Sequence, residues 1–328
     1  MMYKGYDFFP HDSRWNILRW RGLFVGISLA LVVVTAGLLA TRGLNYGVDF
    51  RGGTLFEVQS GTTALDIGAL RNKLNQLNLG DVQVQAVGTQ GNEALVRIGQ
   101  QTDEKSQAAA SAQVRATLGE GITIRRSETV GPTVSAELWY SGTLAVVLAL
   151  VGVAIYVWFR FEWQFAVAGI VALAHDVFVT AGVFSLMWYE FDLATMAALL
   201  TLAGYSMNDT VVTFDRVREN LRKYKRKPLE EVLNDSVNET LSRTIMTAGS
   251  TFLAVTALWL FGTEAIQGFA FAMLFGVIIG TYSSVFVAAP LILWLGLNRE
   301  SFGGAKGPAA STVSTGATQA ASKAKSKA

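Results

Sequence analysis

Six apolar stretches that are long enough to cross a lipid bilayer constrain the fold of this chain more than any other feature. A helix needs about 20 consecutive apolar residues to cross the hydrocarbon core. The stretches lie at Gly22–Ala40, Leu138–Trp158, Trp163–Trp188, Leu193–Phe214, Thr244–Phe261 and Ala265–Leu297. Only 16% of the residues are charged, against about 25% in soluble domains. The sequence therefore predicts a polytopic α-helical membrane protein with six transmembrane helices.

The positions of lysine and arginine predict the orientation of these helices. Basic residues gather in the N-terminal lead, 1–21, and in the segment 215–243. The charged residues in the turns after the third and fifth stretches are all acidic: Glu190, Asp192 and Glu264. Loops rich in lysine and arginine stay in the cytoplasm, so both termini are predicted to be cytoplasmic. The first stretch is long and intact and follows a basic lead, which favours an uncleaved anchor over a cleaved signal peptide.

Residues 41–137, between the first two stretches, are predicted to form a small extracytoplasmic α+β domain. Strand patterns and helix patterns alternate along it at Leu55–Gln59, Leu65–Leu77, Val82–Val87, Ala94–Ile98, Asp103–Leu118 and Ile122–Arg126. The order β-α-β-β-α-β is that of the ferredoxin-like arrangement. Glycines lie in or beside both tethers to the membrane, at Gly47, Gly52, Gly53 and Gly131. Because glycine changes its backbone angles at low steric cost, we expect the domain to move relative to the helices.

The remaining segments complete the domain organisation. Residues 138–297 are predicted to form the helix bundle, interrupted by the cytoplasmic loop 215–243. In that loop the fourth helix continues as a charged helix to Lys227, Pro228 breaks it, and a second helix follows at Leu229–Leu241. The tail, 298–328, is rich in alanine, serine, glycine and lysine, so it cannot bury a core and is expected to be disordered.

Asp209 is the strongest candidate for a functional residue, because it lies inside the fourth apolar stretch. An ionisable group within the bilayer is costly and usually faces a partner group or a water-filled path. Polar residues recur every four positions around it, at Thr201, Tyr205 and Thr213, so they share its helix face. The sequence therefore predicts a proton-responsive or ion-handling site that contains Asp209, the adjacent Asn208 and Tyr205. An interfacial aspartate that is merely solvated is the alternative.

Two further spans carry candidate residues. His175 and Asp176 lie near the middle of the third stretch, and a histidine titrates near neutral pH, which suits a proton relay. Arg243 opens the fifth stretch and stays protonated, so it is expected to hold Asp209 ionised until a proton competes. For His175 and Asp176, the alternative is a hydrogen-bonded pair that only fixes helix packing. For Arg243, it is an arginine at the membrane end that reaches lipid phosphate.

The sixth stretch contains Gly276-Val-Ile-Ile-Gly280, followed by Ser284. Small residues four positions apart let helices approach closely, so this motif predicts helix packing.

No nucleotide-binding loop and no cluster of histidine and cysteine is present in the sequence, and it contains no cysteine at all. We therefore expect no enzymatic activity, no cofactor, no metal site and no nucleic-acid partner. The basic loop predicts a solvated cytoplasmic surface, with contact to anionic lipid or a ribosome as alternatives.

Several motifs taken together resemble the SecF family, which belongs to the SecDF group of RND-like proteins. They are Gly47-Val-Asp-Phe-Arg-Gly-Gly-Thr54, Val130-Gly-Pro-Thr-Val-Ser135, His175-Asp176, Gly204-Tyr-Ser-Met-Asn-Asp-Thr-Val-Val-Thr-Phe-Asp-Arg-Val-Arg-Glu219 and Leu241-Ser-Arg-Thr-Ile-Met-Thr247. The resemblance covers about Gly22 to Leu297. It implies half of an RND-type transporter, with SecD as the other half, in the bacterial inner membrane. The family's proton-path aspartate and arginine correspond to Asp209 and Arg243.

The resemblance also implies a function and partners. SecF and SecD are expected to use the proton-motive force to assist protein export and membrane insertion through the SecYEG translocon, acting on unfolded preproteins. YajC and an insertase are further implied partners. Two alternatives remain: a stand-alone RND-like exporter of small molecules, and a non-catalytic scaffold of the translocon. A single transporter half with one small domain argues against the first. The scaffold requires that Asp209 and Arg243 be packing residues.

Overall fold

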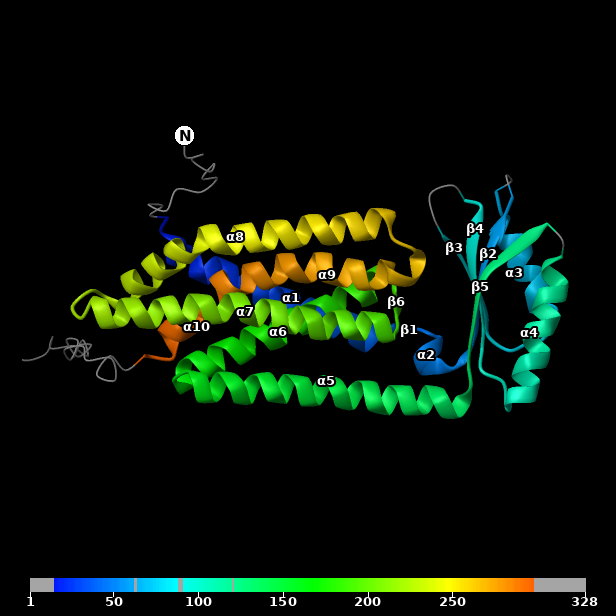
Figure 1. Cartoon of the computed structure of the whole chain (residues 1–328), viewed down its shortest axis with the longest axis horizontal. Helices are drawn as coiled ribbons and strands as arrows, with labels where there is room; N and C mark the ends of the chain where they lie inside the picture. The colour runs from blue at the N-terminus through cyan, green and yellow to red at the C-terminus, as the bar shows by residue number, and fades with distance from the viewer. Residues whose placement is uncertain (1–14, 62–63, 88–90, 120, 298–328) are drawn as a thin grey trace, which may run out of the picture.

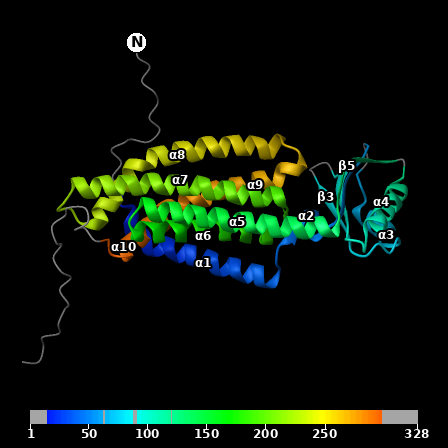
Figure 2. The same ribbon diagram turned by 60° about the horizontal axis from the view of Figure 1, so that its bottom comes forward.

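The computed structural model describes residues 15–61, 64–87, 91–119 and 121–297. It consists of a long helical bundle with an α+β domain at one end, which we call the domain end; the opposite end is the far end (Figure 1). The same two parts are seen after rotation, with α1 and α8 on opposite sides of the bundle (Figure 2). The predicted disordered tail and residues 1–14 of the lead lie outside the described residues.

Long helices form the bundle at nearly all of the predicted positions. They are α1 (Arg21–Thr41), α5 (Pro132–Arg160), α6 (Trp163–Met187), α7 (Leu193–Lys223), α8 (Leu229–Phe261) and α9 (Glu264–Ser283). A short 3-10 helix, Ile17–Trp20, precedes α1, and a π-helix, Ser284–Ala288, joins α9 to α10 (Ala289–Trp294). Among the described residues, 5 helices are long and apolar enough to cross a membrane, and α7 is not one of them. The polar residues around Asp209 lower its apolarity.

Three helix boundaries differ from those that the sequence predicted. The fourth helix ends at Lys223, and the segment Leu229–Leu241 is not a separate helix but the first part of the 33-residue helix α8. No glycine or proline occurs between Leu229 and Ala248 to interrupt it. Residues 132–137, assigned to the α+β domain, belong to α5, because Pro132 occupies the first turn, where its missing N–H costs nothing.

Helices α6 and α9 form the centre of the bundle. In their most apolar windows 56% and 61% of the residues are buried, against 6% for α5 and 11% for α8. Glycines allow the close approach: a Cβ on Gly276 of α9 would lie 2.6 Å from Leu202 of α7, and one on Gly280 would lie 3.1 Å from Ser206. The predicted packing role of the glycine motif in the sixth stretch is confirmed.

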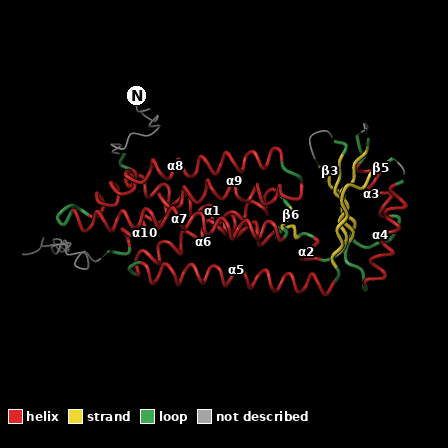
Figure 3. The backbone as a smooth tube through the Cα atoms, in the orientation of Figure 1, coloured by secondary structure: helices red, strands yellow, loops and turns green. Residues whose placement is uncertain are grey.

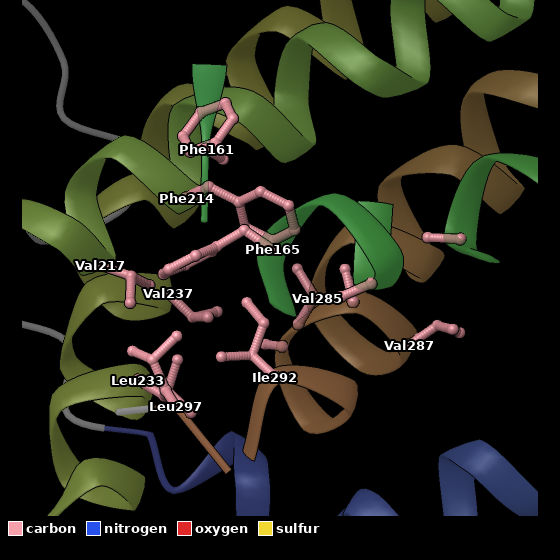
Figure 4. Packing of buried hydrophobic residues seen from close by; sticks show 14 of the residues in the cluster. Phe161, Phe165, Phe214, Val217, Leu233, Val237, Val285, Val287, Ile292 and Leu297 are labelled. Carbon is pink, nitrogen blue, oxygen red and sulfur yellow. The ribbon is translucent and has the colours of Figure 1, made fainter. Parts of the chain in front are cut away.

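An apolar core closes the far end of the bundle (Figure 4). The Phe214 ring of α7 lies 5.2 Å from Phe165 of α6 and 5.7 Å from Phe161, measured between ring centroids. Leu233 of α8 and Ile292 of α10 are fully buried in the same cluster. This cluster packs the charged extensions of α7 and α8 against α6 and α10.

The α+β domain contains the strands and helices that the sequence predicted. They are β2 (Gly53–Ser60), α3 (Ile67–Asn75), β3 (Val82–Val87), β4 (Glu93–Ile98), α4 (Glu104–Leu118) and β5 (Ile122–Val130). The sheet has the order β3-β4-β2-β5, and its pairings are antiparallel. Both helices cover the sheet face that is turned away from the bundle (Figure 3). Phe56, Leu74, Val96 and Val114 are among the residues buried between sheet and helices.

The junction between the two parts contains short elements that the sequence did not predict. Strand β1 (Asn45–Tyr46) pairs in parallel with β6 (Glu190–Phe191), and α2 (Val48–Arg51) follows β1. A cavity of about 440 Å³ separates the open face of the large sheet from the β6 turn. Gly53 has a φ of 114°, and a Cβ there would lie 2.3 Å from the carbonyl oxygen of Ile98, so this position requires glycine.

Candidate functional site

Asp209 is held inside the bundle by hydroxyl groups from two neighbouring helices. It lies on α7 and is 9% exposed. Its Oδ1 accepts a hydrogen bond of 2.7 Å from Thr244 Oγ1 of α8, and its Oδ2 accepts one of 3.1 Å from Ser284 Oγ at the start of the π-helix. Neutral donors stabilise the ionised carboxylate without cancelling its charge. A group in this environment can bind and release a proton.

A second buried carboxylate, Asp176 of α6, is bonded to Ser283, the residue next to Ser284 in the chain. It has no exposed surface. Its Oδ1 is 3.0 Å from His175 Nδ1, and its Oδ2 accepts hydrogen bonds of 2.6 Å from both Ser206 Oγ and Ser283 Oγ. His175 Nε2 is buried and has no hydrogen-bond partner among the described residues. His175 and Asp176 therefore form the hydrogen-bonded pair that the sequence left open as the alternative to a proton relay, with one imidazole nitrogen left over.

The expected partnership between Asp209 and Arg243 is not formed by direct contact. Arg243 is exposed, and no ion pair joins it to Asp209 among the described residues. The reason is the helix geometry: successive residues point about 100° apart, and it is Thr244 that faces Asp209. Two hydroxyls, and not the guanidinium, contact the Asp209 carboxylate; electrostatic control of Asp209 by Arg243 stays a prediction.

The other residues predicted around Asp209 separate into different environments. Tyr205 is half-buried and faces Thr247 and Thr251 of α8. Asn208 is exposed and lines a shallow groove between α5 and α7. Thr201 is also exposed and donates to the carbonyl oxygen of Ala197 in its own helix. The polar stripe is thus divided: Asp209 and Thr213 are buried, and Thr213 lies near Thr240 of α8, away from the Asp209 carboxylate's hydroxyl partners.

Three residues of the site were not predicted: Ser206, Thr244 and Ser283. Hydroxyl residues are common in membrane helices because they can donate to a carbonyl of the preceding turn. Thr210 does so, with a bond of 3.1 Å to Ser206 O. Composition therefore does not distinguish such a residue from one that reaches a neighbouring helix. The available signal was their spacing: Ser206 lies three positions before Asp209, and Ser283 directly precedes Ser284.

The residues assembled here are buried acids, an imidazole and hydroxyls that lie within hydrogen-bond distance of one another. No group of three or more histidine, cysteine, aspartate or glutamate side chains suited to a metal ion occurs in the described ranges. The site instead contains two buried carboxylates, one imidazole and four hydroxyls from α6, α7, α8 and the α9 end. A π-helix begins at Ser284, and single π-turns occur frequently at functional sites.

Comparison with known protein families covers most of the chain. The family model for the C-terminal part of the protein export membrane proteins SecD and SecF matches residues 110–298. A second model, the SecD/SecF GG motif, matches residues 37–64, which include Gly52 and Gly53. The region with the buried carboxylates and the region with the paired glycines therefore both match SecD/SecF models.

Individual relatives and solved structures agree with these matches. The protein translocase subunit SecF of Cereibacter sphaeroides is 50% identical over 283 residues, covering 84% of this chain and 87% of the relative. The SecDF subunit of Brucella abortus is 41% identical, covering 90% of this chain but 39% of that longer one. The crystal structure of SecDF from Thermus thermophilus superimposes with a TM-score of 0.79 at 36% identity, over 87% of this chain and 39% of that one. The resemblance predicted from the motifs is confirmed, and the chain belongs to the SecF family of protein translocase subunits.

Proposed function

We propose that this chain pairs with SecD and uses the proton-motive force to assist SecYEG-dependent protein export and membrane insertion. The observation that carries the proposal is the buried carboxylate of Asp209, which lies inside the bundle and is held by Thr244 and Ser284 from two other helices. Ionisable groups retained within a membrane bundle are generally functional, because their burial is costly. His175, Asp176 and Tyr205 would complete the proton-responsive group on this side of the complex.

An exposed polar surface supports the partnership with SecD. Arg243 and Ser250 of α8, and Thr201 and Asn208 of α7, are exposed although they lie in or at the ends of membrane-length helices. Polar side chains in a membrane face protein or water in preference to lipid tails. In the SecDF chain of Brucella abortus, the region similar to this chain is continuous with a longer polypeptide. We infer that SecD covers the polar surface of α7 and α8.

The proposal includes a topology. Helix α7 would be the sixth span, since Leu193–Phe214 is long enough to cross a bilayer once its polar face is covered by protein. The basic residues of the α7–α8 connection would be cytoplasmic. Both termini would then lie on the cytoplasmic side of a bacterial inner membrane, and the α+β domain would lie on the opposite side. The β3-β4-β2-β5 order supports a ferredoxin-like assignment for that domain.

The energy of proton movement suits a limited conformational change. One proton that crosses 100 mV releases about 2.3 kcal/mol, and one pH unit adds about 1.4 kcal/mol. This is enough to bias two conformations that differ by a few kcal/mol, but less than the roughly 5–15 kcal/mol that stabilises a folded domain. The protein would therefore act on preproteins that are already unfolded. We propose no enzymatic reaction, cofactor or nucleic-acid partner; YajC and an insertase remain proposed partners.

Inverted membrane vesicles that contain SecD and SecYEG test the proposal. Asp209→Asn should abolish the gradient-dependent part of preprotein export while the complex with SecD still purifies. Asp215→Asn is the matched control, because it changes the same residue type on the same helix, where the side chain is 44% exposed and paired with Arg160. Normal gradient-dependent export by Asp209→Asn would contradict the proposal. Loss of the complex with SecD in the Asp209→Asn variant would instead favour the alternative of a non-catalytic scaffold of the translocon.

A further inference from the structure

Ser283 and Ser284 are adjacent in the chain, but their hydroxyls contact different buried carboxylates. Ser283 Oγ lies 2.6 Å from Asp176 Oδ2, and Ser284 Oγ lies 3.1 Å from Asp209 Oδ2. We propose that this serine pair is a positioning device that couples Asp176 to Asp209, so that the two carboxylates respond to protons as one unit. This inference rests on the proposed proton-coupled function and adds residues to it.

Each serine hydroxyl has one carboxylate oxygen and one backbone carbonyl oxygen within hydrogen-bond distance. Ser283 Oγ is also 3.1 Å from the carbonyl oxygen of Gly280, and Ser284 Oγ is 3.1 Å from that of Thr281. A hydroxyl has one proton to donate, so each serine chooses between a carboxylate and a backbone carbonyl. An ionised carboxylate is the stronger acceptor. When the carboxylate binds a proton, the serine is free to turn its own proton to the carbonyl.

The backbone changes helix type at the serine pair. The α-helix α9 ends at Ser283, and the π-helix starts at Ser284. Gly280 O already accepts the backbone N–H of Ser284, so the carbonyl that Ser283 could choose belongs to the α-to-π transition itself. A proton-dependent change in serine donation therefore alters the hydrogen bonds where the helix changes type. That local change can be transmitted along α9, which is central to the bundle.

Ionisable side chains from several helices surround the serine pair. The ionisable side chains near it from the packed helices are His175 and Asp176 of α6, Tyr205 and Asp209 of α7, Arg243 of α8 and Tyr282 of α9. Arg243 acts on Asp209 from a distance, while the serines touch both acids directly. The unpartnered His175 Nε2 is a buried acceptor or donor next to Asp176. It gives a displaced proton a place to bind on the α6 side.

Serine variants of the SecD complex in proton-driven vesicles test the coupling. Ser283→Ala and Ser284→Ala should each move the pH midpoint of export stimulation upward by about one unit, because an ionised carboxylate loses a donor. The double variant should lose less export stimulation than the product of the two single losses, because the two serines act as a unit. Threonine at either position keeps the hydroxyl and should restore the midpoint. Thr256→Ala is the control: Thr256 is not among the polar residues assigned to the SecD surface, and its hydroxyl donates to the carbonyl oxygen of Phe252 within α8.

The outcomes separate this inference from the proposed function. An unchanged midpoint in both alanine variants, with Asp209→Asn still abolishing stimulation, would overturn the coupling and leave the function intact. Retained stimulation in Asp209→Asn would overturn the function itself. Where an alanine variant fails to accumulate, the cysteine variant provides the comparison with threonine, because its thiol is a weak donor of similar size. Equal midpoints for cysteine and threonine would then contradict the inference.

Discussion

Arg97, on β4 of the α+β domain, forms an ion pair with Glu190, which lies on β6 between α6 and α7. Arg97 Nη1 also donates a hydrogen bond of 2.9 Å to the carbonyl oxygen of Tyr46 on β1. The guanidinium thus holds both strands of the small parallel sheet, β1 and β6, and attaches the domain to the bundle. Arg97 is 8% exposed, so this contact is shielded from solvent.

Arg97→Ala should loosen the domain from the bundle. Removing one partner of a buried ion pair typically costs about 3–5 kcal/mol, because it leaves an uncompensated charge. We expect faster hydrogen exchange at the amides of Tyr46 and Phe191, measured by mass spectrometry on the purified complex. Arg125→Ala is the control, since Arg125 is 48% exposed and pairs with Glu93 within the domain. Equal exchange in the two variants would show that the Arg97 contact does not attach the domain.

Attachment of the domain should strengthen as the external pH falls. Burial raises the pKa of Glu190 above its ordinary value despite the nearby Arg97, and burial together with Asp49 raises the pKa of Asp192. A raised pKa in the attached state means that this state binds protons more tightly. The added stability is complete below the ordinary pKa values and is lost as pH rises through the raised ones. Hydrogen exchange at β1 and β6, after correction for the intrinsic pH dependence of amide exchange, should slow as the pH is lowered from 7 toward the ordinary carboxylate range.

Glu190→Gln isolates this effect, because the amide cannot titrate. The variant should show a weaker pH dependence of exchange at β1 and β6, with the remainder due to Asp192. Glu128→Gln provides a matched control: Glu128 lines the same cavity but pairs with Arg126 within the domain. Faster exchange at the lower pH in the unmodified protein would reverse the predicted sign and reject the role of these carboxylates.

Cross-linking the domain to the bundle should block export if the domain moves. Gln85 of β3 and Trp188 after α6 line the same cavity, and the chain contains no cysteine. A cleavable cross-link between cysteines at these positions should stop export, and reduction should restore it. Cysteines at Lys73 and Thr117, which join α3 to α4 within the domain, should have no effect. Full export with the first cross-link complete would show that motion is unnecessary.

Gly276→Ala should destabilise the bundle. The added Cβ would lie 2.6 Å from the Leu202 side chain, and overpacking typically costs about 1–3 kcal/mol. A lower unfolding temperature in detergent is the expected result. Gly249→Ala is the control, because nothing lies within 4 Å of its added Cβ and alanine favours a helix by about 1 kcal/mol. Similar unfolding temperatures for both variants would mean that α9 and α7 can separate at no cost.

Arg243→Gln should weaken association with SecD instead of mimicking Asp209→Asn. The exposed guanidinium lies at the polar surface that we assign to the partner and has no contact with Asp209. Co-purification of SecD with a tag on this chain measures the association, and Ser242→Ala, one residue earlier on α8, serves as the control. An intact complex together with a fully lost proton response would instead support electrostatic control of Asp209 by Arg243.

The sequence by itself determined the helices, the strands and the two acidic candidates. Membrane-length apolar runs and alternating strand patterns are local signals, because burial in lipid or in a sheet core acts on each segment separately. Asp209 and Asp176 were visible for the same reason: a charge in an apolar run is conspicuous without knowledge of its neighbours. The GG motif was visible too, although the close approach of Gly53 to Ile98 was not.

The tertiary structure decided which side chains meet. The choice between Arg243 and Thr244 as the partner of Asp209 depends on the rotation of α8, and a difference of one residue turns a side chain by about 100°. The roles of Ser206 and Ser283 arise because α6, α7 and α9 converge at one level. Strands β1 and β6 pair across more than a hundred residues and are too short to leave a local pattern. Such contacts depend on how separate helices pack, and that packing is a property of the whole bundle.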